Sequence, residues 1–93
     1  MQIQHPAIVS VGRQIRARRE DAGLSQEEFA ARAGLDRAYY SHIERGRYNI
    51  TLSVLFRIAW VLKCDPGALL PPLAQLEDLP ARSKAVRSSQ IPD

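Results

Sequence analysis

The chain has 93 residues, of which 45% are hydrophobic and 25% are charged, and its formal net charge is +3. This length predicts one domain and excludes a ligand-binding domain of ordinary size beside it. The first residues contain no long apolar run, so we expect neither a signal peptide nor a membrane span. The single cysteine, Cys64, excludes a disulfide framework and a multi-cysteine zinc site, and we expect it to fill a gap in the core.

The N-terminal segment predicts an arm followed by a helix. Residues 1–6 form the arm, which ends at Pro6, a residue suited to the first turn of a helix. Helical spacing of apolar residues then predicts a helix over 7–22, and Gly23 is suited to its C-terminal cap. The apolar residues with this spacing are Ile8, Val11, Ile15 and Ala22.

Two further helices follow, each with a recognisable start. Ser25 and Glu28 have the spacing of a capping box, which predicts a second helix that runs to about Ala33. Asp36 is a good N-cap for a third helix that runs through Glu44. We expect a loop after the third helix.

The C-terminal half predicts two more helices and a tail. Thr51 is suited to cap a fourth helix that runs through about Lys63. A short fifth helix begins at Pro66 and ends near Leu70, because Pro71-Pro72 cannot continue it. The fourth helix is expected to carry five residues inward: Leu52, Leu55, Ile58, Ala59 and Leu62.

No segment alternates like a strand, so we expect an all-α domain of five helices over residues 7–70. Residues 71–93 are predicted to be a partly disordered tail. In this tail we expect weak docking of three leucines, and disorder beyond about Arg82. The three leucines are Leu73, Leu76 and Leu79.

The second and third helices, joined at residues 33–35, form a helix-turn-helix pattern over residues 25–45. Gly34 allows the left-handed backbone that such a turn often needs. On the third helix Tyr40 and Ile43 are predicted to face inward. The opposite arc is polar and basic, with the width to enter a DNA major groove. It consists of Arg37, Ala38, Ser41, His42 and Arg45.

Arginines are clustered on both sides of this arc, which favours a nucleic-acid partner over a simple solvated surface. Four arginines and one acidic residue, Glu44, lie between Arg37 and Arg57. A second cluster, partly offset by Glu20 and Asp21, contains Arg13, Arg16, Arg18 and Arg19.

Residues 12–70 resemble the Cro and phage-repressor type of helix-turn-helix domain, the XRE family, and are similar in particular to restriction–modification controller proteins. The resemblance implies a five-helix lambda-repressor-like fold. It is carried by Ile15, Arg19, Gly23-Leu-Ser-Gln-Glu-Glu-Phe-Ala30, Ala33-Gly-Leu35, Ile43-Glu-Arg-Gly46, Leu55, Ile58, Ala59 and Leu62.

The resemblance implies a role for each matching position. Arg19 and Glu44 match an internal ion pair between the first and third helices. Tyr39 matches a base-reading position, although packing under the following loop is the alternative. The base-reading set that it implies is Arg37, Ala38, Tyr39 and His42, to which the outer arc adds Ser41, and the phosphate-contacting set is Gln26, Arg45, Arg47 and Asn49. Well-known phage repressors carry glutamines where Ala38 and His42 stand, so their operators do not transfer to this chain.

The fourth helix carries more apolar surface than one core needs, because Phe56 and Trp60 lie partly outside its inward stripe. Trp60 can be covered either by the tail leucines or by a second subunit. One recognition helix contacts few base pairs, so we expect a two-fold dimer that spans two half-sites. Its predicted interface consists of Phe56, Trp60, Leu69 and Leu70.

These features predict a cytoplasmic, autoregulatory transcription regulator that binds double-stranded DNA as a homodimer on a (pseudo)palindromic operator. We expect no cofactor, metal, membrane or small-molecule effector. An enzyme is not expected, because His5 and His42 are far apart and no carboxylate pair or nucleophile–base set accompanies them. The alternative is an antitoxin whose tail binds a toxin, although the Pro71-Pro72 break argues against it.

Overall fold

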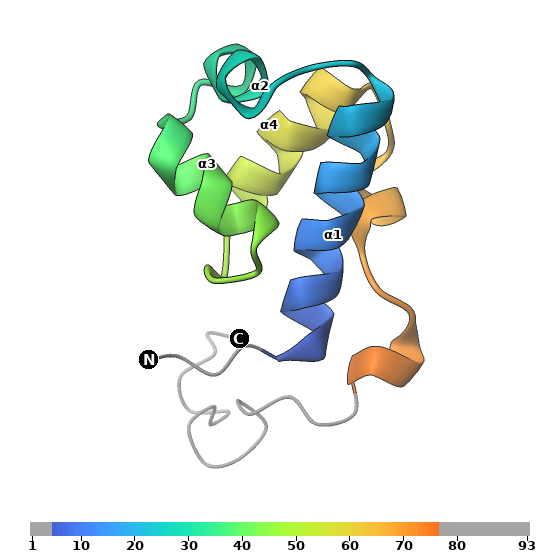
Figure 1. Ribbon diagram of the computed structural model, residues 1–93. Coiled ribbons are helices and arrows are strands. Elements are labelled where there is room, and N and C mark those ends of the chain that lie inside the picture. The colour runs from blue at the N-terminus through green and yellow to red at the C-terminus, as the bar shows by residue number, and fades with distance from the viewer. Residues whose placement is uncertain (1–4, 77–93) are drawn as a thin grey trace, which may run out of the picture.

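The computed structural model describes residues 5–76, and all regular elements in this part of the chain are helices, as predicted (Figure 1). Its elements are α1 (Pro6–Asp21), α2 (Gln26–Ala33), α3 (Arg37–Glu44), α4 (Leu52–Leu62) and two short 3-10 helices, η1 (Pro66–Leu69) and η2 (Leu73–Leu76). In Figure 1, α3 lies to the left of α1 with α4 seen between them, α2 lies above α3, and the two 3-10 helices lie to the right of α1. Arg82 and Leu79 lie outside the described residues.

The helices begin where capping side chains satisfy their first backbone amides. Ser25 Oγ accepts the amide of Glu28 at 3.0 Å and the Glu28 carboxylate accepts the amide of Ser25 at 2.9 Å, so the predicted capping box is confirmed. Asp36 and Thr51 cap α3 and α4 by accepting the amides of Tyr39 and Val54. The cap of α1 is His5, whose Nδ1 accepts the amide of Ala7 at 2.9 Å; no sequence signal identified it.

The predicted short fifth helix is not confirmed as an α-helix. Pro66–Leu69 is a single 3-10 turn, in which the amide of Leu70 donates to the carbonyl of Gly67 at 3.1 Å. An α-helical bond to that carbonyl would need an amide at Pro71, which has none. Leu70 itself is extended (φ −95°, ψ 150°), the conformation that a following proline favours.

The core forms where the four helices and η1 meet. Its largest fully buried side chains are Ile15, Phe29, Tyr40, Ile58 and Leu69, and the rings of Phe29 and Tyr40 stack with centroids 4.9 Å apart. Cys64 is half-buried and packs against this core, as expected.

Two leucines occupy the opposite environments from those predicted. Leu69 is 0% exposed, so it belongs to the core and offers no surface to a second subunit. Leu52 is 68% exposed, although it was expected to point inward. It is the first residue of α4 and lies on the side of Phe56, four residues later, rather than on the buried side.

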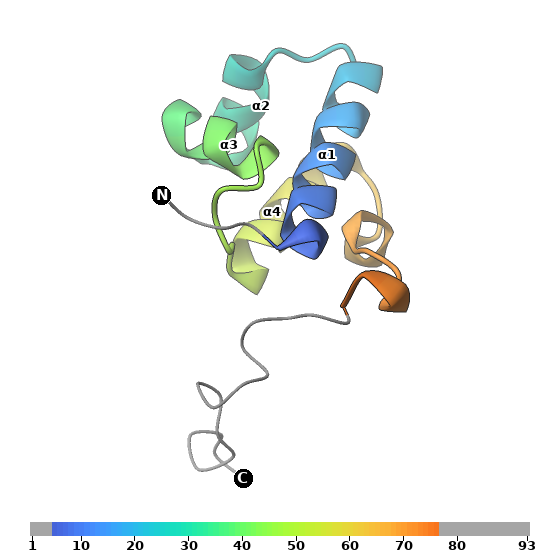
Figure 2. The same cartoon turned by 60° about the horizontal axis from the view of Figure 1, so that its bottom comes forward.

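The end of α3 approaches α1 closely, and two glycines permit this approach (Figure 2). A Cβ atom on Gly12 would lie 2.6 Å from the carbonyl oxygens of Ile43 and Glu44. A Cβ atom on Gly46, which has φ +73°, would lie 2.8 Å from Cα of Val9. The backbone of α3 and its following loop therefore lies directly against α1, which determines how the side chains of the two helices meet.

Candidate nucleic-acid interface

The outer face of α3 is presented on a compact α2–α3 unit. Gly34 ends α2 with the left-handed backbone that was expected (φ 72°, ψ 33°). Tyr40 and Ile43 are buried, as predicted, and they attach α3 to the core. The opposite arc lies at the surface, where Arg37, Ala38 and Arg45 are exposed and Ser41 and His42 are half-buried.

Glu44 accepts hydrogen bonds from side chains of all three helices around the site. Arg19 of α1 contacts it with Nε at 2.6 Å from Oε2 and Nη2 at 3.1 Å from Oε1. Gln26 of α2 donates its Nε2 to Oε1 at 2.9 Å, and the hydroxyl of Tyr40 donates to Oε2. The ion pair between Arg19 and Glu44 therefore belongs to a larger network that joins α1, α2 and α3.

The electrostatics of this network keep Glu44 ionised. Burial opposes ionisation, but the hydrogen bonds from Arg19, Tyr40 and Gln26 outweigh it and hold the pKa of the Glu44 carboxyl below its usual range. The hydrogen bond to Glu44 raises the pKa of Arg19. Burial, with the neighbouring carboxylate, raises the pKa of Tyr40, which stays a neutral donor. Glu44 and Arg19 are therefore both charged, and the Glu44 carboxylate also accepts hydrogen bonds from two neutral donors, Tyr40 and Gln26.

Gln26 is oriented by this network. Its side-chain nitrogen is held at Glu44, and its backbone N–H is at the first position of α2, where a helix offers no acceptor. Such amides are suited to contact a phosphate. Gln26 and Glu44 were both singled out from the sequence, but the hydrogen bond between them was not predicted, nor was the bond from Tyr40 to Glu44. The four-residue spacing of Tyr40 and Glu44 was the available signal for the latter.

The loop after α3 folds back over the outer face of that helix. The Tyr48 ring stacks on Tyr39 with centroids 5.3 Å apart and meets His42 edge-on at 5.4 Å. Arg47 Nη1 lies 3.3 Å from His42 Nδ1. Tyr39 thus packs under the loop, which was one of its two alternatives, while Arg47 and Asn49 remain exposed. Tyr48 was not identified from the sequence.

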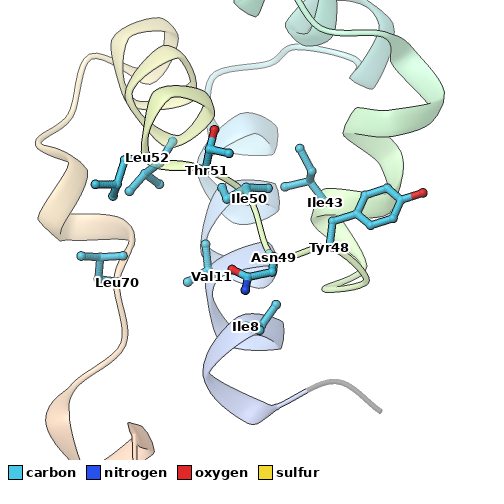
Figure 3. A pocket seen from close by; sticks show the side chains of 11 residues that line it. Ile8, Val11, Ile43, Tyr48, Asn49, Ile50, Thr51, Leu52 and Leu70 are labelled. Atoms are coloured by element: carbon cyan, nitrogen blue, oxygen red, sulfur yellow. The ribbon is translucent and has the colours of Figure 1, made fainter. Parts of the chain in front are cut away.

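An apolar stripe on α4 faces away from the core, formed by Leu52, Phe56 and Trp60. Leu70 is exposed nearby, and it borders the same apolar pocket as Leu52, between α4 and α1 (Figure 3). Trp60 is 74% exposed and Leu73 is 82% exposed, so the described part of the tail does not cover Trp60. Lys63 places its ammonium 5.1 Å from the Trp60 ring centroid.

The described residues show neither a membrane span nor a metal cluster. None of their helices is both long and apolar enough to cross a bilayer. No group of three His, Cys, Asp or Glu side chains within residues 5–76 is placed to hold a metal ion.

Comparison with known proteins gives consistent matches. A family model described as a helix-turn-helix matches residues 15–69. An immunity repressor protein of Bacillus phage phi105 is 39% identical over 62 residues, which are 67% of this chain and 43% of the repressor. The chain spans about half the length of this and the next curated relatives.

Solved structures give the same result. The restriction-modification controller protein C.AhdI from Aeromonas hydrophila matches with a TM-score of 0.66 and 38% identity, over 68% of this chain and 96% of that one. The biofilm master regulator SinR, in complex with DNA, matches with a TM-score of 0.61 and 32% identity, over 63% of this chain and 95% of that one. The chain therefore belongs to the XRE-type helix-turn-helix family of DNA-binding transcriptional regulators.

Proposed function

We propose that this protein is a sequence-specific regulator that binds its operator with α3 in the major groove of double-stranded DNA. The observation that carries the proposal is the exposed, polar and basic outer face of α3, held by the Glu44 network and by the buried Tyr40 and Ile43. A face of this width and chemistry suits the major groove, which presents a distinct pattern for each base pair. The DNA in the SinR structure supports the same partner class.

The exposed side chains of the site divide by chemistry. Arg37, at the first position of α3, is suited to bidentate contact with the O6 and N7 atoms of guanine. Ala38 permits close approach and contact with a thymine methyl group, while Ser41 and His42 complete the base-reading set. Tyr39 supports this set from beneath, through its stacking on Tyr48. Gln26 at the start of α2 and the exposed residues after α3 hold the phosphates. The latter are Arg45, Arg47 and Asn49.

We further propose that the regulator acts as a two-fold dimer on a (pseudo)palindromic operator. The exposed apolar side chains of Leu52, Phe56, Trp60 and Leu70 supply a surface whose burial would favour association. A dimer places two α3 helices about one DNA turn apart. Operator occupancy then depends on protein concentration, which allows the protein to regulate its own gene. The repressor and controller names of its relatives favour this role over an antitoxin role. We propose that the protein acts in the cytoplasm.

Selection of bound sites from random duplex DNA tests this function. The purified protein should enrich a motif of two inverted half-sites with centres roughly 10 base pairs, or one DNA turn, apart. Recovery of no motif, with equal affinity for all duplexes, would contradict sequence-specific regulation. Recovery of an isolated half-site would contradict the dimer.

A further inference from the structure

A polar concavity lies where the end of α3 and the start of α2 meet α1. Its polar lining consists of Arg13, Arg16, Arg19, Gln26, Glu44 and Arg45. Four arginines and one carboxylate therefore share one hollow. The two predicted phosphate contacts Gln26 and Arg45 lie in it together with two arginines of α1 that have no predicted role.

The single carboxylate of the hollow does not neutralise its outer arginines. Glu44 is occupied by Arg19 in the interior. Arg16 pairs with Glu20 at 3.1 Å on the exposed side of α1, and exposed pairs of this kind are weak and easily exchanged. Within residues 5–76, no carboxylate lies within ion-pair distance of Arg13 or Arg45. The rim thus keeps an excess of cationic donors.

The backbone holds these donors in place. Gly12, one residue before Arg13, allows the carbonyl end of α3 to abut α1, and this contact brings Arg45 to the same hollow as the α1 arginines. Gln26 contributes the first amide of α2, which has no acceptor within the helix. Guanidinium groups match the tetrahedral oxygens of a phosphate through paired N–H donors, and they remain charged at every physiological pH.

We propose that this concavity binds a phosphate group, with Arg13 and Arg16 as its outer ligands. The inference rests on the proposed function and extends it, because it adds residues of α1 to the DNA-phosphate contacts proposed for the α2–α3 unit. A phosphodiester of the operator is the favoured source, because Gln26 and Arg45 connect the hollow to the reading face of α3. A free phosphorylated compound has the same chemistry, and the experiment separates the two sources.

The test compares the double variant Arg13→Gln/Arg16→Gln with Arg32→Gln in the full chain. Arg32 is an exposed arginine at the other end of α2, outside the concavity. DNA affinity is measured across a salt series on the selected operator and on random duplex. The double variant should lower the slope of log K against log salt concentration by roughly two, about one for each lost phosphate contact, on both DNAs. Arg32→Gln should leave the slope unchanged.

A second arm titrates wild type and the double variant with sodium pyrophosphate. Unchanged DNA slopes together with saturable pyrophosphate binding that only the wild type shows would assign the site to a free phosphorylated compound. Unchanged slopes without such binding would overturn the inference. Thermal unfolding and sedimentation confirm that the variants keep their fold and assembly. A wild type that shows no salt-dependent DNA binding would contradict the proposed function, and the pyrophosphate arm would still decide the site.

Discussion

Side chains from three helices of the site meet at Glu44, a buried carboxylate that also orients Gln26, one of the residues proposed to contact DNA. Its carboxylate pairs with Arg19, accepts the hydroxyl of Tyr40, and orients Gln26. The resemblance to the XRE family implied the ion pair, since Arg19 and Glu44 match its positions. The bond to Gln26 could not be predicted, because it depends on how α2 and α3 pack.

Glu44→Gln should make the protein less stable at neutral pH and less sensitive to acid. A native carboxyl whose pKa is lowered contributes stability above its unfolded pKa, near 4.5, and this contribution is lost as pH falls through the native pKa. Removal of one partner of a buried pair costs roughly 3–5 kcal/mol. Chemical unfolding of both proteins between pH 3 and 7, roughly the window of carboxyl titration, measures the difference.

Glu27→Gln is the matched control, because Glu27 is an exposed glutamate in the first turn of α2, next to Gln26. It should retain the stability and acid profile of the wild type. If Glu44→Gln had wild-type stability at neutral pH, the Glu44 network would contribute little to the free energy of unfolding.

Arg47 is expected to act on phosphates rather than on bases. It is exposed in the loop after α3, and its guanidinium lies beside His42. Arg47→Ala should therefore weaken binding to all duplexes by a similar factor and lower the salt slope by about one. Affinity measurements on operator and random DNA test this, and a loss confined to the operator would instead assign Arg47 to base reading.

At the scale of elements, side-chain caps made the helix starts predictable. Ser25, Asp36 and Thr51 each accept a backbone amide at the start of their helix, as expected. The fifth helix lies at the predicted residues but is only a 3-10 turn, because Pro71 has no amide to donate an α-helical bond. The close approach of α1 and α3 could not be predicted from the sequence either. Gly12 lies inside α1, where no turn or cap requires a glycine and nothing in the local pattern indicates a neighbouring helix.

Gly12→Ala tests the contact between α1 and α3. Alanine ordinarily favours a helix, but here its methyl group would meet two backbone carbonyl oxygens at 2.6 Å, and overpacking of this kind typically costs about 1–3 kcal/mol. We expect a lower melting temperature for this variant. Gly67→Ala is the control, because nothing lies within 4 Å of its added Cβ atom. Equal melting temperatures for the two variants would mean that α1 and α3 can move apart to accommodate the methyl group at no cost in stability.

The whole molecule exposes an apolar surface that its own described residues do not cover. Excess apolar character on α4 could be predicted from Phe56 and Trp60, because they fall outside the inward stripe. The exposure of Leu52 and the burial of Leu69 could not be predicted. Both are leucines in short apolar segments, and only tertiary packing decides which one is buried. The surface offered to a partner therefore consists of Leu52, Phe56, Trp60 and Leu70.

Trp60→Ala should weaken a dimer formed through this surface. A buried tryptophan at an interface commonly contributes about 2 kcal/mol or more, which corresponds to a dissociation constant raised roughly 30-fold. Analytical ultracentrifugation over a concentration series measures the constant. Leu73→Ala is the control, since Leu73 is equally apolar and exposed but lies off the α4 stripe. A monomeric wild type, or a dimer unaffected by Trp60→Ala, would refute the interface.

The central claim is that α3 reads bases, and Arg37→Ala tests it most directly. Arg37 is exposed at the first position of α3 and has no described partner that a shorter side chain would release. Affinities of wild type and variant are measured on the selected operator and on operators changed at one position of each half-site. We predict that the variant loses roughly 1–3 kcal/mol on the operator and loses discrimination at a single position per half-site. An equal loss on every duplex would contradict base reading by α3.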